Sequence, residues 1–329
     1  MIDIKLLEQL CLCNGISGDE GNVRNLIINE IKDCADDIKT DNLGNLIVFK
    51  KGKKSAKSKL MVSAHMDEVG LMVTDITSDG YLKFDEVGGI DRRVLPGKRV
   101  CVGRNGLNGV IGVKPIHLTN GDEKTAVPKM SDMYIDIGAE SREDALKYVN
   151  YGDGINFEGD FKINGKTVVT KALDDRFGCY VLINLIKSEP EYDMYFTFVV
   201  QEEVGLRGAR PAAFTVNPDF AFVIESTTAA DVAEVDASHQ VCNLSKGATV
   251  TVMDRATVYD KEMISAAFEL AEKNNIAVQY KRAVAGGNDS GAIHQSRGGV
   301  RTLAVSLPSR YIHAPSTAAN LDDCESVLK

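Results

Sequence analysis

The stretch that decides the fold runs from Leu60 to Gly70 and reads LMVSAHMDEVG. Its first five residues are apolar or small, as is typical of a buried strand, and the run ends abruptly in the polar residues His65, Asp67 and Glu68. In open α/β sheets, ligands bind at the carboxyl ends of the strands. We therefore predict a buried strand here, with functional side chains at its carboxyl end.

The sequence changes character after residue 65. Residues 66–165 contain 15 of the 29 glycines, and short strand-like runs alternate there with turn dipeptides such as Gly88-Gly89 and Pro96-Gly97. Short strands with frequent turns indicate a β-barrel or sandwich. We therefore predict that residues 66–165 form an inserted β domain.

The flanking residues 1–65 and 166–329 are predicted to form one α/β domain, because the first part needs later strands to complete a sheet. Apolar periodicity and length predict helices and strands on both sides of the insertion. The expected helices are 175–188 and 260–274, preceded by a helix after a capping box formed by Ser17 and Glu20. The expected strands include 46–49, 194–200, 220–224 and 303–307.

Composition and charge limit the class of protein. The 329 residues are 44% hydrophobic and 26% charged, with 38 Lys and Arg against 47 Asp and Glu, giving a net charge of −9. An acidic surface repels nucleic acid and anionic membranes, so neither is an expected partner. Small molecules or peptides remain as substrates. Seven scattered cysteines without CxxC pairs, and an N-terminus too charged for a secretion signal, predict a cytoplasmic protein with reduced thiols.

Acids and histidines recur at the ends of the predicted strands. Three apolar runs each end in acid, at Asp174-Asp175, Glu202-Glu203 and Glu225, while His65 and His313 follow two further runs. For any one of these acids, a helix cap or a surface ion pair is the more frequent role. Together at one sheet edge, however, their negative charges would oppose ionisation unless cations neutralised them. Two divalent cations, with one acid left as general base, are the economical interpretation.

Asp67 is a candidate for positioning His65. The two residues are two apart, so they share a face if the strand continues through them. Asp67 would then orient the imidazole, while His65 presents its other nitrogen to a cation. An HxD pair alone is weak support for such a site.

Seven segments resemble those of the dinuclear-metal aminopeptidases that include glutamyl aminopeptidase and the tetrahedral, self-compartmentalised aminopeptidases. They occur in the same order over nearly the whole chain and are GISGDE (15–20), DNLGNL (41–46), SAHMDEVG (63–70), KALDDRFG (171–178), QEEVGLRGA (201–209), GGNDSGAIH (286–294) and RYIHAP (310–315). The resemblance implies a zinc-exopeptidase-like α/β fold, with a mixed sheet sandwiched by helices and the β insertion serving in dimerisation.

The resemblance also implies residue roles. His65 and Glu225 would bind one metal ion, Glu203 and His313 the other, with Asp174 bridging both. Glu202 would be the general base, a cis peptide would join Asp174 to Asp175, and Zn²⁺ or Co²⁺ would be the ions. Short peptides would be the substrates of a homo-oligomer, from dimer to tetrahedral dodecamer. The chain is expected to lack part of a terminal helix beyond Leu328.

The chain departs from the family pattern at several positions. Glu225 replaces a frequent Asp, so this ligand is one methylene longer. Asn288 and Ser290 replace Thr and Ala in the Gly-Gly loop, which either lines the substrate site or forms a helix-capping turn. His117, His239 and His294 are expected to be structural or outside the ligand set.

Other functions remain open. A related dinuclear amidohydrolase or deacylase could share this metal set, and a requirement for a free substrate amine would separate it from an aminopeptidase. A glycosidase is less favoured, although relatives have carried endoglucanase labels, because the chain has no Trp and its acids associate with histidines. A non-enzymatic assembly protein would have lost ligands, and none of the six expected positions is lost.

Overall fold

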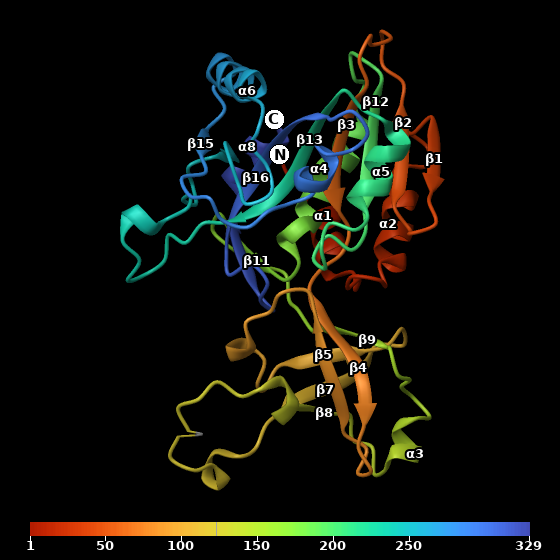
Figure 1. Cartoon of the computed structure of the whole chain (residues 1–329), viewed down its shortest axis with the longest axis vertical. Helices are drawn as coiled ribbons and strands as arrows, with labels where there is room; N and C mark the ends of the chain where they lie inside the picture. Colours follow the sequence, from red (N-terminus) through yellow and green to blue (C-terminus); the bar gives the residue numbers. More distant parts are fainter. Residues whose placement is uncertain (123) are drawn as a thin grey trace.

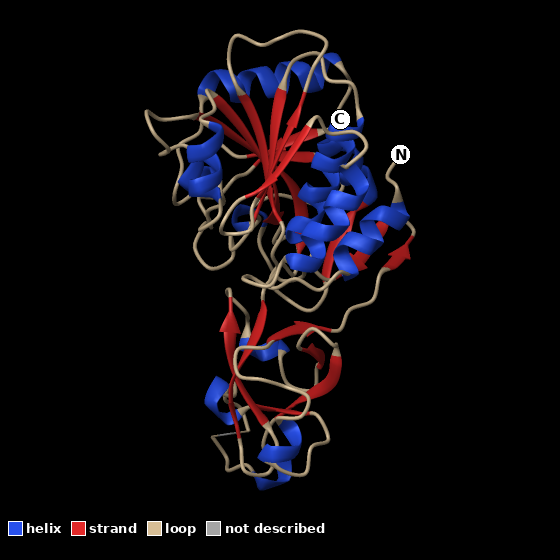
Figure 2. Ribbon diagram, turned by 90° about the vertical axis from the view of Figure 1, so that its right-hand side faces the viewer, coloured by secondary structure: helices blue, strands red, loops and turns tan. Residues whose placement is uncertain are grey.

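The computed structural model describes residues 1–122 and 124–329. A large mixed sheet lies between layers of helices (Figures 1 and 2). A closed barrel of six strands forms a separate body at one end of this α/β part. This arrangement confirms the predicted α/β fold with a barrel-like insertion. No helix among the described residues has the length and apolar character needed to cross a bilayer.

The helices are mostly short. The α-helices are α1 (Ile4–Leu12), α2 (Gly21–Ile31), α3 (Arg142–Ala145), α4 (Leu173–Lys187), α5 (Ala209–Val216), α6 (Lys261–Lys273), α7 (Ser290–Ile293) and α8 (Leu321–Leu328). The 3₁₀ turns are η1 (Arg92–Val94), η2 (Ile116–Leu118), η3 (Met130–Asp132) and η4 (Ala237–His239).

The large sheet has 11 strands. Its main order is β1 (Asp37–Thr40), β2 (Leu46–Lys50), β12 (Met194–Val199), β3 (Leu60–His65), β13 (Phe220–Thr228), β16 (Arg301–Arg310), β17 (Thr317–Asn320), β11 (Thr167–Thr170) and β10 (Lys162–Asn164), with β14 (Ala248–Val250) and β15 (Val278–Tyr280) at one side. The central strands β12, β3, β13 and β16 are parallel. Their carboxyl ends therefore meet at one edge, where ligands bind in sheets of this kind.

The barrel is built from strands of the insertion. In order around the barrel they are β4 (Gly70–Ile76), β5 (Leu82–Val87), β8 (Tyr134–Asp136), β7 (Leu107–Gly112), β6 (Arg99–Val102) and β9 (Gly154–Phe157). Strand β10 pairs with β11 in the large sheet, although it lies inside the range 66–165 drawn from the sequence.

Each part of the molecule has its own apolar core. The barrel encloses a cluster that runs from Leu71 to Phe157. The main core under α1, α2, α4 and α8 joins residues from both flanks of the insertion, such as Leu10 and Phe198. Alternate residues of β3 serve opposite faces, since Val62 packs into this core and Met61 into the cluster beneath α5 and α7.

The predicted capping box does not form. Glu20 is itself the N-cap of α2, and its carboxylate accepts the N–H groups of Gly18 and Gln201. The Ser17 hydroxyl instead donates to Asp67. The side chains of Ser17 and Glu20 thus hydrogen-bond to residues of other segments and not to the first turn of α2. The helix begins without a side-chain cap.

Candidate metal centre and active site

His65 is the last residue of β3 and is 1% exposed. Its Nδ1 lies 3.0 Å from the main-chain oxygen of Asp67, which can only accept, so Nδ1 carries the proton. Nε2 is then free for a cation, and it faces Glu225 at 3.2 Å and Asp174 at 3.5 Å. This is the tautomer that a metal-binding histidine requires.

Asp67 lies beside His65, as expected, with its Oδ1 3.6 Å from His65 Nδ1. Strand β3 ends at His65, so the argument from a shared strand face does not apply. The main-chain oxygen of Asp67 orients the imidazole, while its carboxylate accepts the N–H groups of Glu202 at 3.0 Å and Glu203 at 3.2 Å. The Ser17 hydroxyl donates to the same carboxylate at 2.6 Å. Asp67 thus fixes both the histidine and the turn that presents the two glutamates.

Glu225 lies within β13, which continues to Thr228 instead of ending at Ile224 as expected. Val223 of this strand pairs with Ser63 of β3. Two residues further along both strands, the same register places Glu225 beside His65. This explains the contact between their side chains. The Glu225 side chain is 8% exposed, and its Oε2 has no hydrogen-bond partner.

Asp174 lies between the two histidines at the start of α4. Its Oδ1 is 3.5 Å from His65 Nε2, and its Oδ2 is 3.5 Å from His313 Nε2. A cis peptide joins Asp174 to Asp175, as the resemblance implied. Asp175 is buried and accepts the N–H groups of His65 and Gly178, so it holds strand and helix together behind the site.

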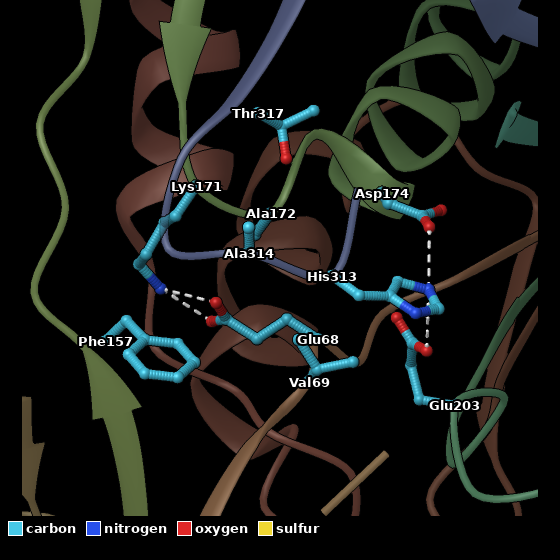
Figure 3. Close-up of a pocket in the computed structure, with 10 residues that line it drawn as sticks. All are labelled: Glu68, Val69, Phe157, Lys171, Ala172, Asp174, Glu203, His313, Ala314 and Thr317. Atoms are coloured by element: carbon cyan, nitrogen blue, oxygen red, sulfur yellow. Dashed lines mark hydrogen bonds and ion pairs between the residues drawn. The ribbon is translucent and has the colours of Figure 1, made fainter. Parts of the chain in front are cut away.

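His313 follows β16 in a left-handed conformation with φ 60°. Its Nε2 lies 3.2 Å from Glu203 Oε2, and its side chain is 41% exposed. Figure 3 shows His313 between Asp174 and Glu203. His313 is therefore the ligand candidate that solvent reaches, whereas His65 is enclosed.

The six predicted side chains form overlapping groups whose donor atoms are close enough together to share a metal ion. In each group the donor atoms lie within 4.8 Å of one another, and the groups are His65 with Glu202 and Glu203, His65 with Asp174 and Glu225, and Asp174 with Glu203 and His313. Buried Asp174 Oδ1 and Glu225 Oε2 have no hydrogen-bond partner. Orphaned carboxylate oxygens beside imidazoles suit divalent cations such as Zn²⁺.

Protons and cations compete for this cluster. Burial raises the pKa of Glu203 to about 8, and the Asp174 charge adds to the rise. Burial likewise raises the pKa of Glu225 to about 8. Burial opposes protonation of His313, but Asp174 and Glu203 raise its pKa to about 9. At neutral pH a cation must therefore displace protons from its ligands.

Glu202 differs from its neighbour Glu203. Its Oε2 lies 4.0 Å from His65 Nε2, and no hydrogen bond to its carboxylate is present among the described residues. Burial raises the pKa of Glu202 well above its usual range, and the Glu225 and Asp289 charges add to the rise. A carboxylate of this kind is suited to take up and release a proton.

Sequence reasoning missed Asp289 as a member of the site. It is fully buried, and neither carboxylate oxygen has a hydrogen-bond partner. Burial raises its pKa to about 7, against the attraction of His65. Its position inside the conspicuous GGNDSGAIH segment was the available signal.

Sequence reasoning also missed a buried ion-pair cluster next to the site, formed by Glu68, Lys171 and Arg176. The Lys171 ammonium contacts both oxygens of Glu68, at 2.6 and 2.8 Å (Figure 3). Arg176 donates to the same carboxylate. Arg176 also donates to the main-chain oxygen of Met66 at 2.7 Å. The segment that carries His65 and Asp67 is therefore tied to α4 by charge-assisted hydrogen bonds.

A cavity of about 190 Å³ adjoins the candidate metal ligands. Asp174, Glu202, Glu225 and His313 form part of its wall. A site for one small side chain thus adjoins the candidate metal ligands.

The remaining histidines lie outside the metal-ligand groups of the described residues. His117 and His239 are exposed on 3₁₀ turns, and His294 Nδ1 lies 2.7 Å from the main-chain oxygen of Ser290. Asn288 accepts the N–H of Ser290 at 2.9 Å, which favours the turn over a substrate-lining role for this side chain.

The sequence of residues 44–329 matches the family model of the M42 glutamyl aminopeptidases. The chain belongs to this family. A protein of Acetivibrio thermocellus that carries an aminopeptidase name is 44% identical over 98% of this chain and 96% of its own length. The lysyl aminopeptidase of Pyrococcus furiosus is 33% identical over 100% and 95%, and the glutamyl aminopeptidase of Lactococcus lactis is 32% identical over 93% and 88%. The chain is thus an exopeptidase of the aminopeptidase type.

Solved structures agree with this family membership. The TET aminopeptidase of a marine sediment Thaumarchaeota archaeon superposes with a TM-score of 0.94 at 33% identity, covering 99% of this chain and 93% of that chain. The TET1 peptidase of Pyrococcus horikoshii, which assembles into a tetrahedron or a large octahedral shell, superposes with a TM-score of 0.87 at 40% identity, covering 99% and 96%.

Proposed function

We propose that this M42 aminopeptidase removes N-terminal residues from short peptides with the help of two divalent cations, Zn²⁺ or Co²⁺. The observation that carries the proposal is the position of Asp174, which turns one oxygen to His65 and the other to His313. Each histidine has one further carboxylate at 3.2 Å, Glu225 for His65 and Glu203 for His313. We assign one cation to each pair and Asp174 to both.

When bound, the two cations would lower the pKa of a water and stabilise negative charge on the scissile carbonyl oxygen. Glu202 is proposed as the general base. Its carboxylate accepts a proton from the attacking water and then donates that proton to the leaving amine nitrogen as the C–N bond breaks. Asp67 positions this reaction by holding the main chain of Glu202 and the ring of His65.

A dinuclear amidohydrolase that acts on acylated amines is the alternative with the same ligands. The two differ in whether the substrate needs a free α-amine. We expect hydrolysis of free aminoacyl p-nitroanilides and none of their N-acetylated counterparts. Cleavage confined to the acetylated series would replace the aminopeptidase proposal with the amidohydrolase, and cleavage of a β-glucan alone would support a glycosidase.

We also propose that the chain is a homo-oligomer in which the inserted domain 66–165 joins two subunits, with dimers assembling up to a tetrahedral dodecamer. The assemblies named for the TET1 relative support this proposal. Light scattering should give a mass of at least a dimer, and a monomer at micromolar concentration would contradict it.

The cysteines support a cytoplasmic location. All seven are free, and Cys11, Cys179, Cys242 and Cys324 are buried. Free thiols are typical of reducing compartments.

A further inference from the structure

The geometry points to Glu20 as a positioning residue for the proposed general base, Glu202. Glu20 belongs to the segment GISGDE (15–20), one of the seven family segments, and lies outside the metal-ligand groups of the described residues. Its role rests on the proposed function, because Glu202 is the base of that same reaction. Glu20 acts on this base through the main chain.

One buried amide closes the loop that carries Glu202, residues 200–208, which we call the Glu202 loop. Asn45 is fully buried, its Oδ1 accepts the N–H of Val200 at 3.0 Å, and its Nδ2 donates to the main-chain oxygen of Gly208 at 2.9 Å. A Cβ at Gly208 would lie 2.3 Å from that Oδ1, so only glycine permits this close approach. Both ends of the loop are therefore fixed to one side chain.

Inside the loop, two carboxylates hold the main chain around the base. Asp67 accepts the N–H groups of Glu202 and Glu203. Gln201, the residue before the base, has φ 56°, a left-handed conformation that a residue with a side chain adopts where the surrounding structure holds it. The Gln201 N–H donates to Glu20 Oε1 at 3.1 Å. Glu20 therefore stabilises the main chain immediately before the base.

The Glu20 side chain has a fixed place of its own. It is 4% exposed, and its Oε1 also accepts the N–H of Gly18 at 2.7 Å. Ile16 of the same segment forms a β-bridge with Glu68, whose main-chain N–H donates to Gly15 at 3.0 Å. The segment 15–20 is thus joined to the chain that follows β3, and Glu20 connects the Glu202 loop to both.

The role depends on the length of the side chain and on its acceptor oxygen. Both hydrogen bonds to Glu20 Oε1 come from main-chain N–H groups, which the amide oxygen of a Gln accepts as well. An Asp keeps the negative charge but is one methylene shorter, so its carboxylate lies farther from Gln201. Because a misplacement of about 1 Å can cost roughly 100-fold in rate, loss of the contact should lower kcat.

The test compares three variants of Glu20 in the full-length, metal-loaded protein, with the best of the free aminoacyl p-nitroanilides as substrate. Glu20→Ala and Glu20→Asp should lower kcat roughly 10- to 100-fold, with KM within about threefold of wild type and two metal ions still bound per chain. Glu20→Gln should keep kcat within about threefold of wild type, because it keeps the acceptor.

Asp323 supplies the matched control. It is 1% exposed, accepts the N–H groups of Ser245 at 2.6 Å and Gly247 at 2.7 Å, and lies outside the metal-ligand groups of the described residues. Asp323→Ala removes the same kind of acceptor, so it should destabilise the fold and leave kcat close to that of wild type. An equal loss of kcat in Asp323→Ala and Glu20→Ala would reduce the effect to general stability and overturn the positioning role.

Hydrogen–deuterium exchange gives a readout besides activity. Glu20→Ala should speed exchange of the main-chain amides in the Glu202 loop by roughly fivefold or more, whereas Asp323→Ala should leave that loop unchanged. Glu20→Asp serves if Glu20→Ala does not fold, because residue 20 is the N-cap of α2 and Asp is favoured there. Unchanged exchange of the loop in these Glu20 variants would overturn the role of Glu20.

The outcomes distinguish the two proposals. If wild-type protein cleaves no free aminoacyl p-nitroanilide, the proposed function fails, and the exchange measurement alone decides whether Glu20 holds the loop. If wild-type protein is active and the metal-loaded Glu20→Ala and Glu20→Asp variants keep its kcat, the aminopeptidase stands and the role of Glu20 is overturned. A Glu20→Gln variant as impaired as Glu20→Ala would overturn the acceptor role.

Discussion

At the scale of single residues, two adjacent glutamates have different tasks. Glu203 contacts His313 at 3.2 Å, whereas Glu202 lies over the cavity without a hydrogen bond to its carboxylate among the described residues. We expect Glu202→Gln to keep two metal ions per chain and to lose roughly 100- to 10,000-fold in kcat, because it removes a base and no ligand. Elemental analysis and turnover measured on the same sample check this. Normal turnover in the metal-loaded variant would refute the assignment.

The two histidines should each account for one metal ion. His65→Ala or His313→Ala removes a donor from one ion only, so we expect the bound metal to fall from two ions per chain toward one. His294→Ala is the matched control, since His294 is outside the metal-ligand groups of the described residues. An unchanged stoichiometry in His313→Ala would remove that residue from the ligand set.

Much of this site could be predicted from residue types at strand ends. His65, Asp174 and His313 lie together because parallel strands carry their carboxyl ends to one edge, which is a rule that sequence patterns convey. Asp289 could not be predicted this way, because its importance comes from its burial and from two carboxylate oxygens without a hydrogen-bond partner among the described residues. Those properties depend on the packing of distant segments.

At the scale of elements, the Glu68–Lys171–Arg176 cluster fastens the segment after β3 to the start of α4. All three side chains are at most 5% exposed. We expect Lys171→Met to lower the free energy of unfolding by about 3 kcal/mol, because it leaves a buried carboxylate with one partner fewer. Urea denaturation of the metal-free protein measures this.

The control for that experiment is an ion pair at the surface. Lys187 contacts Glu30 with side chains 36% and 31% exposed. Lys187→Met should cost less than about 1 kcal/mol, since exposed pairs contribute little. Equal effects of the two substitutions would contradict a structural role for the buried cluster.

The elements themselves were predicted unevenly. The helix at 261–273 and the strand at 194–199 differ from expectation by one residue or less at each end, because their apolar periodicity is strong. Strand β1 was not predicted, since its residues Asp37–Thr40 lie at an exposed edge and are mostly polar. Strand β13 is longer than its apolar run because β16 continues to pair with Ser226–Thr228.

At the scale of the whole molecule, metal loading should depend on pH. In the metal-free protein, Glu203 and Glu225 have pKa values raised to about 8, and His313 has a pKa raised to about 9. These groups hold protons at pH 7 that a cation must displace, so metal affinity should increase as pH rises from 6 to 9. Calorimetry in buffers of different ionisation enthalpy should record proton release at pH 7. An affinity independent of pH over this range would contradict the ligand assignment.

The most direct test of the account is a metal titration of chelator-stripped full-length protein, with hydrolysis of free Glu- and Leu-p-nitroanilides followed at each addition of Zn²⁺ or Co²⁺. We predict that stripped protein is inactive and that activity rises until two ions are bound per chain. Full activity in stripped protein, or no activity on any free-amine substrate with two ions bound, would contradict the central claim.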